Sequence, residues 1–246
     1  MMNWNQLISA KRFGMEEFHE ERQENRSEFQ RDYDRLIISA PFRSLQNKTQ
    51  VFPLPGSVFA HNRLTHSLEV ASVGRSLGDD VAKALLERHP ELQDSFLPEI
   101  GSIVSAACLA HDLGNPPFGH SGEKAISTFF SEGKGVRLKE KQPNGEQLSP
   151  MEWEDLTHFE GNANAFRILT HQFEGRRKGG FVLTYTTLAS IVKYPFSSSL
   201  AGTKSKFGFF VSEEESFQKI ATELGLTLLN EHPLKYARHP LVYLVE

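Results

Sequence analysis

Three residues of the chain have side chains that could hold a single metal ion: His66, His111 and Asp112. Two imidazoles and one carboxylate are favoured ligands for manganese, iron, cobalt, nickel or zinc. Three protein ligands would leave open positions on the ion for a water molecule and a phosphate oxygen. The sequence therefore predicts a mononuclear metal centre suited to hydrolysis.

The adjacent pair His111 and Asp112 also has an explanation that needs no metal. A protonated histidine is favourable at a helix C-terminus, and an aspartate often begins the turn that follows. The context favours the metal, because Asp112 stands at the end of the nearly all-apolar segment 103–110. Burying an unpaired carboxylate costs several kcal/mol, so a cationic partner is expected there.

A second pair of residues, His120 and Glu123, could transfer protons. They lie three positions apart where a helix should begin after the rigid loop 114–120, so they share one face. Glu123 could orient the imidazole and hold it protonated, which suits a general acid. The alternative is a helix cap, in which residues 120 and 121 start the helix and Glu123 occupies its first turn.

Two predicted helices position these residues. The first covers about 65–86, and its expected inward stripe, spaced by three and four, is His66, Val70, Val73, Leu77, Val81 and Leu85. The second covers 98–113, with Pro98 at its start and Gly114 as its terminator. On this placement His66 points inward, either as a metal ligand or as a core histidine that donates to a carbonyl group.

The rest of the pattern predicts a mainly helical fold. Further helices are expected near 152–173, 186–194 and 213–224, with a small hairpin in 179–185 and a short strand in 207–211. The alternation of strands and helices that is typical of a parallel sheet does not occur in the sequence. The fold class is therefore mainly α, with at most a small β-hairpin.

Composition indicates a folded globular chain. The 246 residues are 39% hydrophobic and 24% charged, as in proteins with a packed core. The net charge of −4 does not indicate a broad nucleic-acid-binding face. The single cysteine, Cys108, cannot form an internal disulfide and points to a reducing compartment. The sequence contains neither a signal peptide pattern nor an apolar run of membrane-spanning length, so a cytoplasmic protein is expected.

Several segments resemble one known family. They are NRLTHSLEV at 62–70, AHDLGNPPFGHSGE at 110–123 and HFEGNANAFRIL at 158–169, with further matches in 46–54, 192–195 and 205–214. Together they resemble the dGTP triphosphohydrolases (dGTPases) of the HD superfamily. The resemblance implies a helical HD-type phosphohydrolase domain over 35–246, preceded by a charged arm or helix over 1–34.

The resemblance also implies a reaction, in which a dNTP and water give a deoxynucleoside and inorganic triphosphate. One divalent ion, manganese or magnesium above all, with iron, cobalt, nickel or zinc also compatible, would be held by His66, His111 and Asp112. The implied catalytic residues are His120, Glu123 and His158. The implied substrate-binding residues are Gln50 at the sugar 3′-hydroxyl, Arg63, Lys193 and Lys206 at the phosphates, and Asn162 and Tyr194 nearby.

These substrate-binding residues have ordinary explanations as well. The arginine and the two lysines could be surface charges, since most basic residues are exposed. Asn162 could cap the helix that follows it, and Tyr194 could belong to the core.

The resemblance further implies a homo-oligomer and a possible single-stranded nucleic acid effector, with no membrane partner. The family has another aspartate ligand beyond a segment like 239–246, so the native protein is expected to continue past Glu246, and this chain could be inactive. Two alternatives stay open. One is a different HD-type nucleotide phosphohydrolase. The other is a non-catalytic assembly module that binds nucleotide or single-stranded DNA through the basic stretches 134–141 and 175–180.

Overall fold

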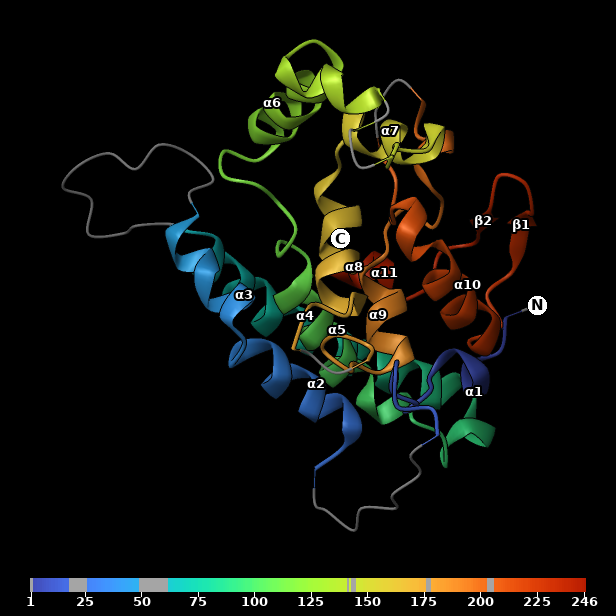
Figure 1. The fold of residues 1–246 in the computed structure, drawn as a ribbon. Helices are drawn as coiled ribbons and strands as arrows, with labels where there is room; N and C mark the ends of the chain where they lie inside the picture. The colour runs from blue at the N-terminus through green and yellow to red at the C-terminus, as the bar shows by residue number, and fades with distance from the viewer. Residues whose placement is uncertain are drawn as a thin grey trace, which may run out of the picture.

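The computed structural model describes residues 2–17, 26–48, 62–140, 142, 145–175, 178–202 and 206–246, and it is mainly helical (Figure 1). The helices are α1 (Trp4–Leu7), α2 (Glu28–Ile37), α3 (Ala40–Ser44), α4 (Arg63–Arg88), α5 (Ile100–Ala110), α6 (His120–Ser131), α7 (Pro150–Thr157), α8 (Gly161–Thr170), α9 (Tyr185–Ile191), α10 (Glu214–Glu223) and α11 (Val242–Val245). Two short antiparallel strands, β1 (Leu228–Asn230) and β2 (Lys235–Tyr236), pair with each other. The expected mainly α fold with a small β-hairpin is confirmed.

Helix α4 begins at Arg63 because Asn62 caps it. The Asn62 side chain accepts a hydrogen bond from the Thr65 N–H at 2.9 Å, and the Thr65 hydroxyl accepts one from the Asn62 N–H at 3.3 Å. This reciprocal capping box satisfies N–H groups that have no partner inside the helix. The cap therefore fixes where the first turn lies, and with it the position of His66.

Helix α4 packs closely against α5 through small side chains. Its buried face consists of Arg63 in the first turn followed by Ser67, Ala71, Gly74, Gly78 and Ala82. A Cβ atom added at Gly78 would lie 2.7 Å from the Gly101 Cα of α5, and one added at Gly74 would lie 2.7 Å from the Cys108 Sγ. The two helix backbones are therefore too close for larger residues at this crossing.

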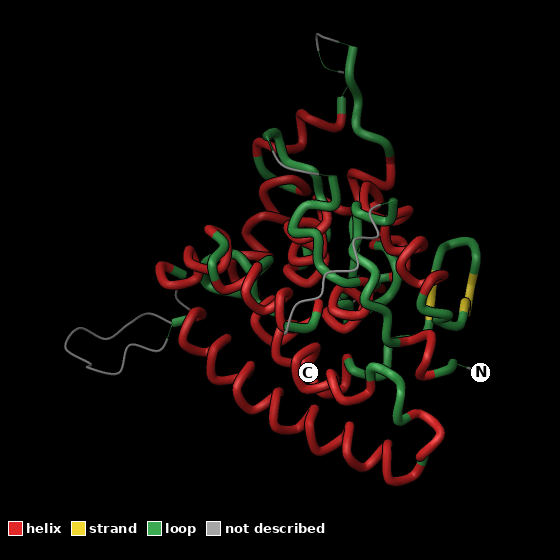
Figure 2. Tube along the Cα trace, turned by 90° about the horizontal axis from the view of Figure 1, so that it is seen from below, coloured by secondary structure: helices red, strands yellow, loops and turns green. Residues whose placement is uncertain are grey.

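The prediction of which α4 residues face inward is partly wrong. Val73 is 61% exposed and Leu77 is 47% exposed, while the other apolar members are half-buried. The spacing of three and four identifies the helix, but close packing selects the smallest residues for the contact with α5. The larger apolar residues of α4 lie beside that contact. Figure 2 shows this long helix along one edge of the molecule. Neither α4 nor any other helix of the described ranges combines the length and apolar character needed to cross a bilayer.

Helix α5 is at the centre of the fold. Every residue from Ile100 to Ala110 is buried, and α2, α4 and α9 pack against it. This agrees with the expectation of a helix that is buried on most sides. The helix ends at Ala110, so His111 is its C-cap and Asp112 follows in the turn.

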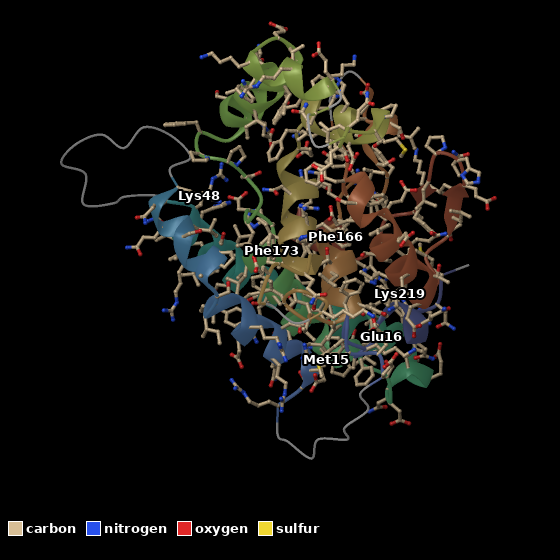
Figure 3. All side chains as sticks on the ribbon, viewed as in Figure 1. Met15, Glu16, Lys48, Phe166, Phe173 and Lys219 are labelled. Carbon is tan, nitrogen blue, oxygen red and sulfur yellow. The ribbon has the colours of Figure 1, made fainter. Side chains whose placement is uncertain are left out.

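Helix α8 connects one end of the molecule with the core. Helices α6 and α7 lie together at that end, and α8 runs from there into the centre (Figure 1). Phe166 of α8 is fully buried, with ring centroids 6.5 Å from Phe209 and 5.8 Å from Phe217, and it lies near the middle of Figure 3. The helical structure expected near 152–173 is present as two helices, α7 and α8, separated at 158–160.

The two β-segments expected from the sequence are wrong in position. Residues 179–185 form a turn and the start of α9, with an isolated bridge between Arg12 and Thr184. Residues 207–211 form no strand, and the Phe207 and Phe209 side chains are fully buried. The strands are β1 and β2, which lie to one side of the helices (Figure 2). The aromatic residues that suggested a strand belong to the core.

The N-terminal residues contact the main helices. Phe29 of α2 is 1% exposed and shares a hydrophobic cluster with α5. Asp32 is fully buried, and it accepts hydrogen bonds from Arg12 at 2.7 Å and from the Thr184 N–H at 2.9 Å. The boundary expected after residue 34 falls inside α2. The division into a charged arm and an HD-type domain stays a prediction.

His239 connects the N-terminal and C-terminal segments. Its ring is 1% exposed, with Nε2 3.0 Å from the Leu7 carbonyl oxygen and Nδ1 accepting from the Leu241 N–H at 3.3 Å. These partners suit a neutral ring that carries its proton on Nε2. Burial, partly opposed by the bond to Leu7, lowers the pKa of His239 from its ordinary 6.5 to about 4.

We predict that the protein loses stability in acid through His239. The ring takes up a proton with a pKa of 6.5 when unfolded and about 4 when folded, so its stabilising effect is complete above pH 6.5 and is lost as the pH falls toward 4. The difference corresponds to about 3 kcal/mol. Urea unfolding between pH 7.5 and 4 should show a weaker pH dependence in His239→Gln, because glutamine does not titrate. Equal pH dependence in both proteins would contradict the prediction.

We predict that Gly78→Ala destabilises the protein more than Gly74→Ala. Alanine is favoured over glycine inside a helix by about 1 kcal/mol. At Gly78, however, the new methyl group meets the backbone of Gly101, whereas at Gly74 it meets the end of the Cys108 side chain. Overpacking typically costs about 1–3 kcal/mol. Urea unfolding should therefore show a loss of up to about 2 kcal/mol for Gly78→Ala and a smaller loss, or a gain, for Gly74→Ala. The reverse order would contradict the packing described above, and the exposed Ser76→Ala provides the baseline for α4.

Candidate metal centre and its flanking acid–base pair

Three potential metal ligands converge where α4 and α5 meet. His66 comes from the beginning of α4, and His111 and Asp112 follow the end of α5. One ligand atom from each residue lies within 4.8 Å of those of the other two. The centroids of the two imidazole rings are 5.3 Å apart, with an interplanar angle of 68°. A single ion can approach all three side chains, since metal–ligand bonds to nitrogen and oxygen are about 2 Å long.

The hydrogen bonding of His111 fits a metal ligand. Its Nδ1 lies 2.6 Å from the Cys108 carbonyl oxygen, so Nδ1 carries the proton and donates it. In the neutral ring Nε2 then keeps its lone pair, and it faces Asp112 Oδ1 at 3.5 Å. Two acceptors that face each other favour a cation between them. The residues present therefore fit a divalent ion, and the bond to Cys108 orients the ligand.

Asp112 has two further partners. Arg63 Nη1 lies 2.7 Å from its Oδ2, and Asn115 Nδ2 donates to its Oδ1 at 2.5 Å. Asp112 and Arg63 are both buried. The cationic partner expected for the buried carboxylate is thus Arg63, a residue for which the resemblance implied phosphate binding. A Cβ atom at Gly119 would lie 3.2 Å from Arg63 Nη2, so Arg63 also contacts the loop before α6.

Lys48 brings a second positive charge to the same place. It follows the short 3-10 helix η1 (Leu45–Asn47), and its Nζ donates to the Leu113 carbonyl oxygen at 3.3 Å. Burial lowers the pKa of Lys48, the charge of Arg63 lowers it further, and Asp112 opposes both. Figure 3 shows Lys48 beside the end of α3. Two cations next to a metal centre attract anions such as phosphate.

The acid–base pair is formed at the start of α6. His120 Nδ1 lies 2.9 Å from Glu123 Oε2, and the other carboxylate oxygen accepts from the Gly161 N–H at 3.0 Å. The Glu123 side chain is 11% exposed, whereas that of His120 is 86% exposed. The N-cap of α6 is Gly119, which has no capping side chain. The structure therefore favours a carboxylate that orients an accessible imidazole over a simple helix cap.

Gly161, at the N-terminus of α8, joins the metal ligands to the acid–base pair. A Cβ atom there would lie 2.1 Å from Asn115 Oδ1 and 2.8 Å from Glu123 Oε1. Asn115 in turn donates to Asp112, and Glu123 bonds His120. Only glycine leaves room for both side chains at this point. The two halves of the candidate site therefore meet at one backbone position.

Lys206 and Asn162 lie beside this junction. Lys206 Nζ is 2.8 Å from Glu160 Oε2 and 3.7 Å from Glu123 Oε2. Asn162 Nδ2 donates to Glu160 Oε1 at 2.6 Å. Asn162 lies in the first turn of α8, and the cap of that helix is Glu160 rather than Asn162.

The other expected site residues have partners elsewhere. His158, at the end of α7, lies 3.1 Å from a glutamate oxygen of its own helix. Lys193 pairs with the Glu246 side chain, and its Nζ lies 5.6 Å from the centroid of the Tyr194 ring. Gln50 falls in 49–61, outside the described residues. The roles assigned to these four residues stay predictions.

The sequence analysis missed three residues that hold the site together, namely Lys48, Asn115 and Glu160. Lys48 and Asn115 lie inside segments that carried the resemblance. Asn115 stands three positions after Asp112, but the glycine and prolines around it predict a loop, where such a spacing gives no helical signal. Glu160 had a usable signal, because an acidic residue before a glycine-initiated helix can cap it. A hydrogen-bonding partner distant in sequence, such as Lys206 for Glu160, leaves no local pattern.

Comparison with known proteins agrees with this geometry. The HD domain family matches residues 63–179. The whole chain is similar to proteins named "Deoxyguanosinetriphosphate triphosphohydrolase-like protein", with 44% identity to one from Synechocystis sp. and 45% to one from Pseudomonas aeruginosa. It is 35% identical, over 96% of its length, to a "Deoxyguanosinetriphosphate triphosphohydrolase" of Yersinia enterocolitica. The chain covers 56%, 54% and 51% of these relatives, which is about half their length.

We predict that His66→Ala and Asp112→Asn each weaken Mn²⁺ binding by about 100-fold or more. Loss of a residue that merely supports a ligand typically costs 10–100-fold in affinity, and these changes remove a ligand itself. Isothermal titration calorimetry with Mn²⁺, supported by elemental analysis, measures the effect. His120→Ala serves as the control and should bind Mn²⁺ like the wild type. Equal weakening in all three variants would show that the ligands are assigned wrongly.

Proposed function

This chain belongs to the deoxyguanosinetriphosphate triphosphohydrolase-like family of the HD superfamily, and on that premise we propose that it carries the metal-binding site of a dNTP triphosphohydrolase. The proposed reaction is metal-dependent hydrolysis of a dNTP, dGTP above all, to deoxynucleoside and inorganic triphosphate. The supporting observation is that His66, His111 and Asp112 converge next to an accessible imidazole held by a buried carboxylate. The names of these relatives support the choice of dGTP.

The metal ligands would hold one divalent ion, with manganese or magnesium as the proposed identity. When bound, such an ion acts as a Lewis acid that polarises a phosphoryl oxygen and favours ionisation of water. The positive charges of Arg63 and Lys48 would stabilise the negatively charged phosphates of the substrate. Because Arg63 is held by Asp112, its guanidinium is already oriented before an anion binds. Preorganised charge of this kind is a large part of phosphoryl-transfer catalysis.

His120 is the proposed proton-transferring residue. Its Nδ1 is bonded to Glu123, so Nε2 is the nitrogen that can exchange a proton with substrate or water. The ring is exposed enough to reach a bound nucleotide, and its partner is fixed by the Gly161 N–H. Displacement of the 5′-oxygen from the α-phosphorus leaves an alkoxide that needs a proton, which suits a general acid. His158, the C-cap of α7, is proposed as a further catalytic residue, and α7 lies at the same end of the molecule as α6 (Figure 1).

The remaining proposals concern substrate contacts and partners. Lys206 and Asn162, held together by Glu160, are proposed to contact the phosphates and the nucleotide. Lys193, Tyr194 and Gln50 complete the proposed substrate-binding set. A homo-oligomer and a single-stranded nucleic acid effector stay predictions from the family resemblance.

We predict that the full-length protein, incubated with dGTP and Mn²⁺ or Mg²⁺, releases deoxyguanosine and inorganic triphosphate in equal amounts. In water labelled with ¹⁸O the label should enter triphosphate, because attack falls on the α-phosphorus. Chromatography and mass spectrometry measure both products. General acid–base catalysis contributes about 100–10,000-fold, so His120→Ala should lose at least about 100-fold in kcat.

Other products would point to a different function. Release of pyrophosphate or orthophosphate would contradict the proposed reaction and indicate another HD-type phosphohydrolase. Salt-dependent binding of single-stranded DNA, without turnover of any dNTP, would instead favour the assembly module.

A further inference from the structure

Glu160 is a buried acid that lies between two residues of the candidate site. Its side chain is 1% exposed, and its two carboxylate oxygens are used differently: Oε1 accepts hydrogen bonds, whereas Oε2 has an ion-pair contact without hydrogen-bond geometry. Oε1 accepts from the Asn162 N–H at 3.1 Å and from Asn162 Nδ2 at 2.6 Å, while Oε2 lies 2.8 Å from Lys206 Nζ. One carboxylate therefore fixes a lysine and an asparagine that are 44 positions apart in the sequence.

Capping of α8 does not explain this arrangement by itself. A cap needs one oxygen, and Asp, Asn, Ser and Thr are the residues that usually provide it. Glutamate is longer, and its additional reach brings the second oxygen to Lys206. The chain thus has a longer acid than the helix end requires, and the acid lies beside Lys206.

The charges near Glu160 keep Lys206 protonated. Burial would lower the pKa of Lys206, but the close contact and charge of Glu160, together with the charge of Glu123, raise it above its ordinary value. Glu123 is already engaged by His120 and Gly161, and its distance from Lys206 is 3.7 Å. Glu160 is therefore the principal partner of the lysine.

We propose that Glu160 is the positioning residue that holds Lys206 and Asn162 in place for the triphosphate group of the substrate. The proposal rests on the function proposed above and extends it to a residue that contacts no substrate itself. A lysine side chain loses rotamer entropy when it binds an anion. Glu160 removes much of that loss beforehand, because it restrains the ammonium group before the phosphate arrives.

Glu160→Asp is the most informative variant. It keeps the negative charge and supplies a favoured cap for α8, but it withdraws the carboxylate by one methylene group from Lys206. We expect kcat/KM for dGTP and the affinity for inorganic triphosphate, measured by calorimetry in the presence of Mn²⁺, to fall about tenfold. The matched control is Glu213→Asp, because Glu213 is a 2% exposed glutamate paired with Arg167 outside the candidate site. For this control, kcat/KM for dGTP and the affinity for inorganic triphosphate should both stay within about twofold of the wild-type values.

A double-mutant cycle tests whether Glu160 acts through Lys206. Lys206→Met should lower triphosphate affinity, and adding Glu160→Asp to it should change the affinity by less than about twofold. A further tenfold loss in the double variant, or a Glu160→Asp protein that behaves like the Glu213→Asp control, overturns the proposal. Thermal unfolding checks that each variant is folded, and Glu160→Gln replaces the aspartate variant if that protein unfolds.

Two measurements, the rate of dGTP hydrolysis and the affinity for inorganic triphosphate, separate this inference from the proposed function. A wild type that binds inorganic triphosphate but hydrolyses no dNTP overturns the reaction, and the triphosphate affinities still decide the role of Glu160. A wild type that hydrolyses dGTP, with Glu160→Asp indistinguishable from its control, overturns the role of Glu160 alone. A wild type that does neither overturns both.

Discussion

The close approach of α4 and α5 determines where the candidate site forms. Small residues on α4, above all Gly74 and Gly78, let the two backbones come near enough for His66 to face His111, with ring centroids 5.3 Å apart. A larger residue at this crossing would push the helices apart and separate ligands that lie on different elements. Packing density tolerates little adjustment inside a core, so metal geometry and helix packing are coupled here. The site therefore depends on residues that carry no chemistry of their own.

The buried charged residues impose a second constraint on the candidate site, because each of them needs a partner of opposite charge or a hydrogen bond. Asp112 has Arg63, Glu123 has His120 and the Gly161 N–H, and Glu160 has Lys206. Apart from His120, these partners are far apart in sequence. They tie α4 to the turn after α5, α6 to the start of α8, and the cap of α8 to the segment around Lys206. An acid left without its partner in such a place costs several kcal/mol. The same groups that are suited to chemistry thus also hold the end of the molecule formed by α6 and α7 against the core.

The sequence predicted the helices that carry the ligands, since periodicity of three and four is a local property. It also placed His66, His111 and Asp112 together, and the structure brings their ligand atoms within 4.8 Å. It failed where tertiary packing decides the outcome. Val73 and Leu77 fit the helical stripe, but the contact selected glycine and alanine instead. The aromatic run 207–211 looked like a strand because aromatic residues favour both strands and cores. The pairing of Arg63 with Asp112 joins residues 49 positions apart, for which spacing gives no signal.

The balance of charge links the metal ion to an anionic substrate. With the histidines left out of the count, the acids Asp112, Glu123 and Glu160 are matched in number by the bases Arg63, Lys48 and Lys206. These six charges therefore cancel one another. A divalent ion held by His66, His111 and Asp112 adds two positive charges to this partly buried region, where uncompensated charge is costly. A polyphosphate that supplies the missing negative charge would bind better with the ion present, and by linkage the ion would bind better with the polyphosphate present. This coupling of charges is a physical reason, separate from the family resemblance, to propose a highly charged anion as the ligand of the candidate site.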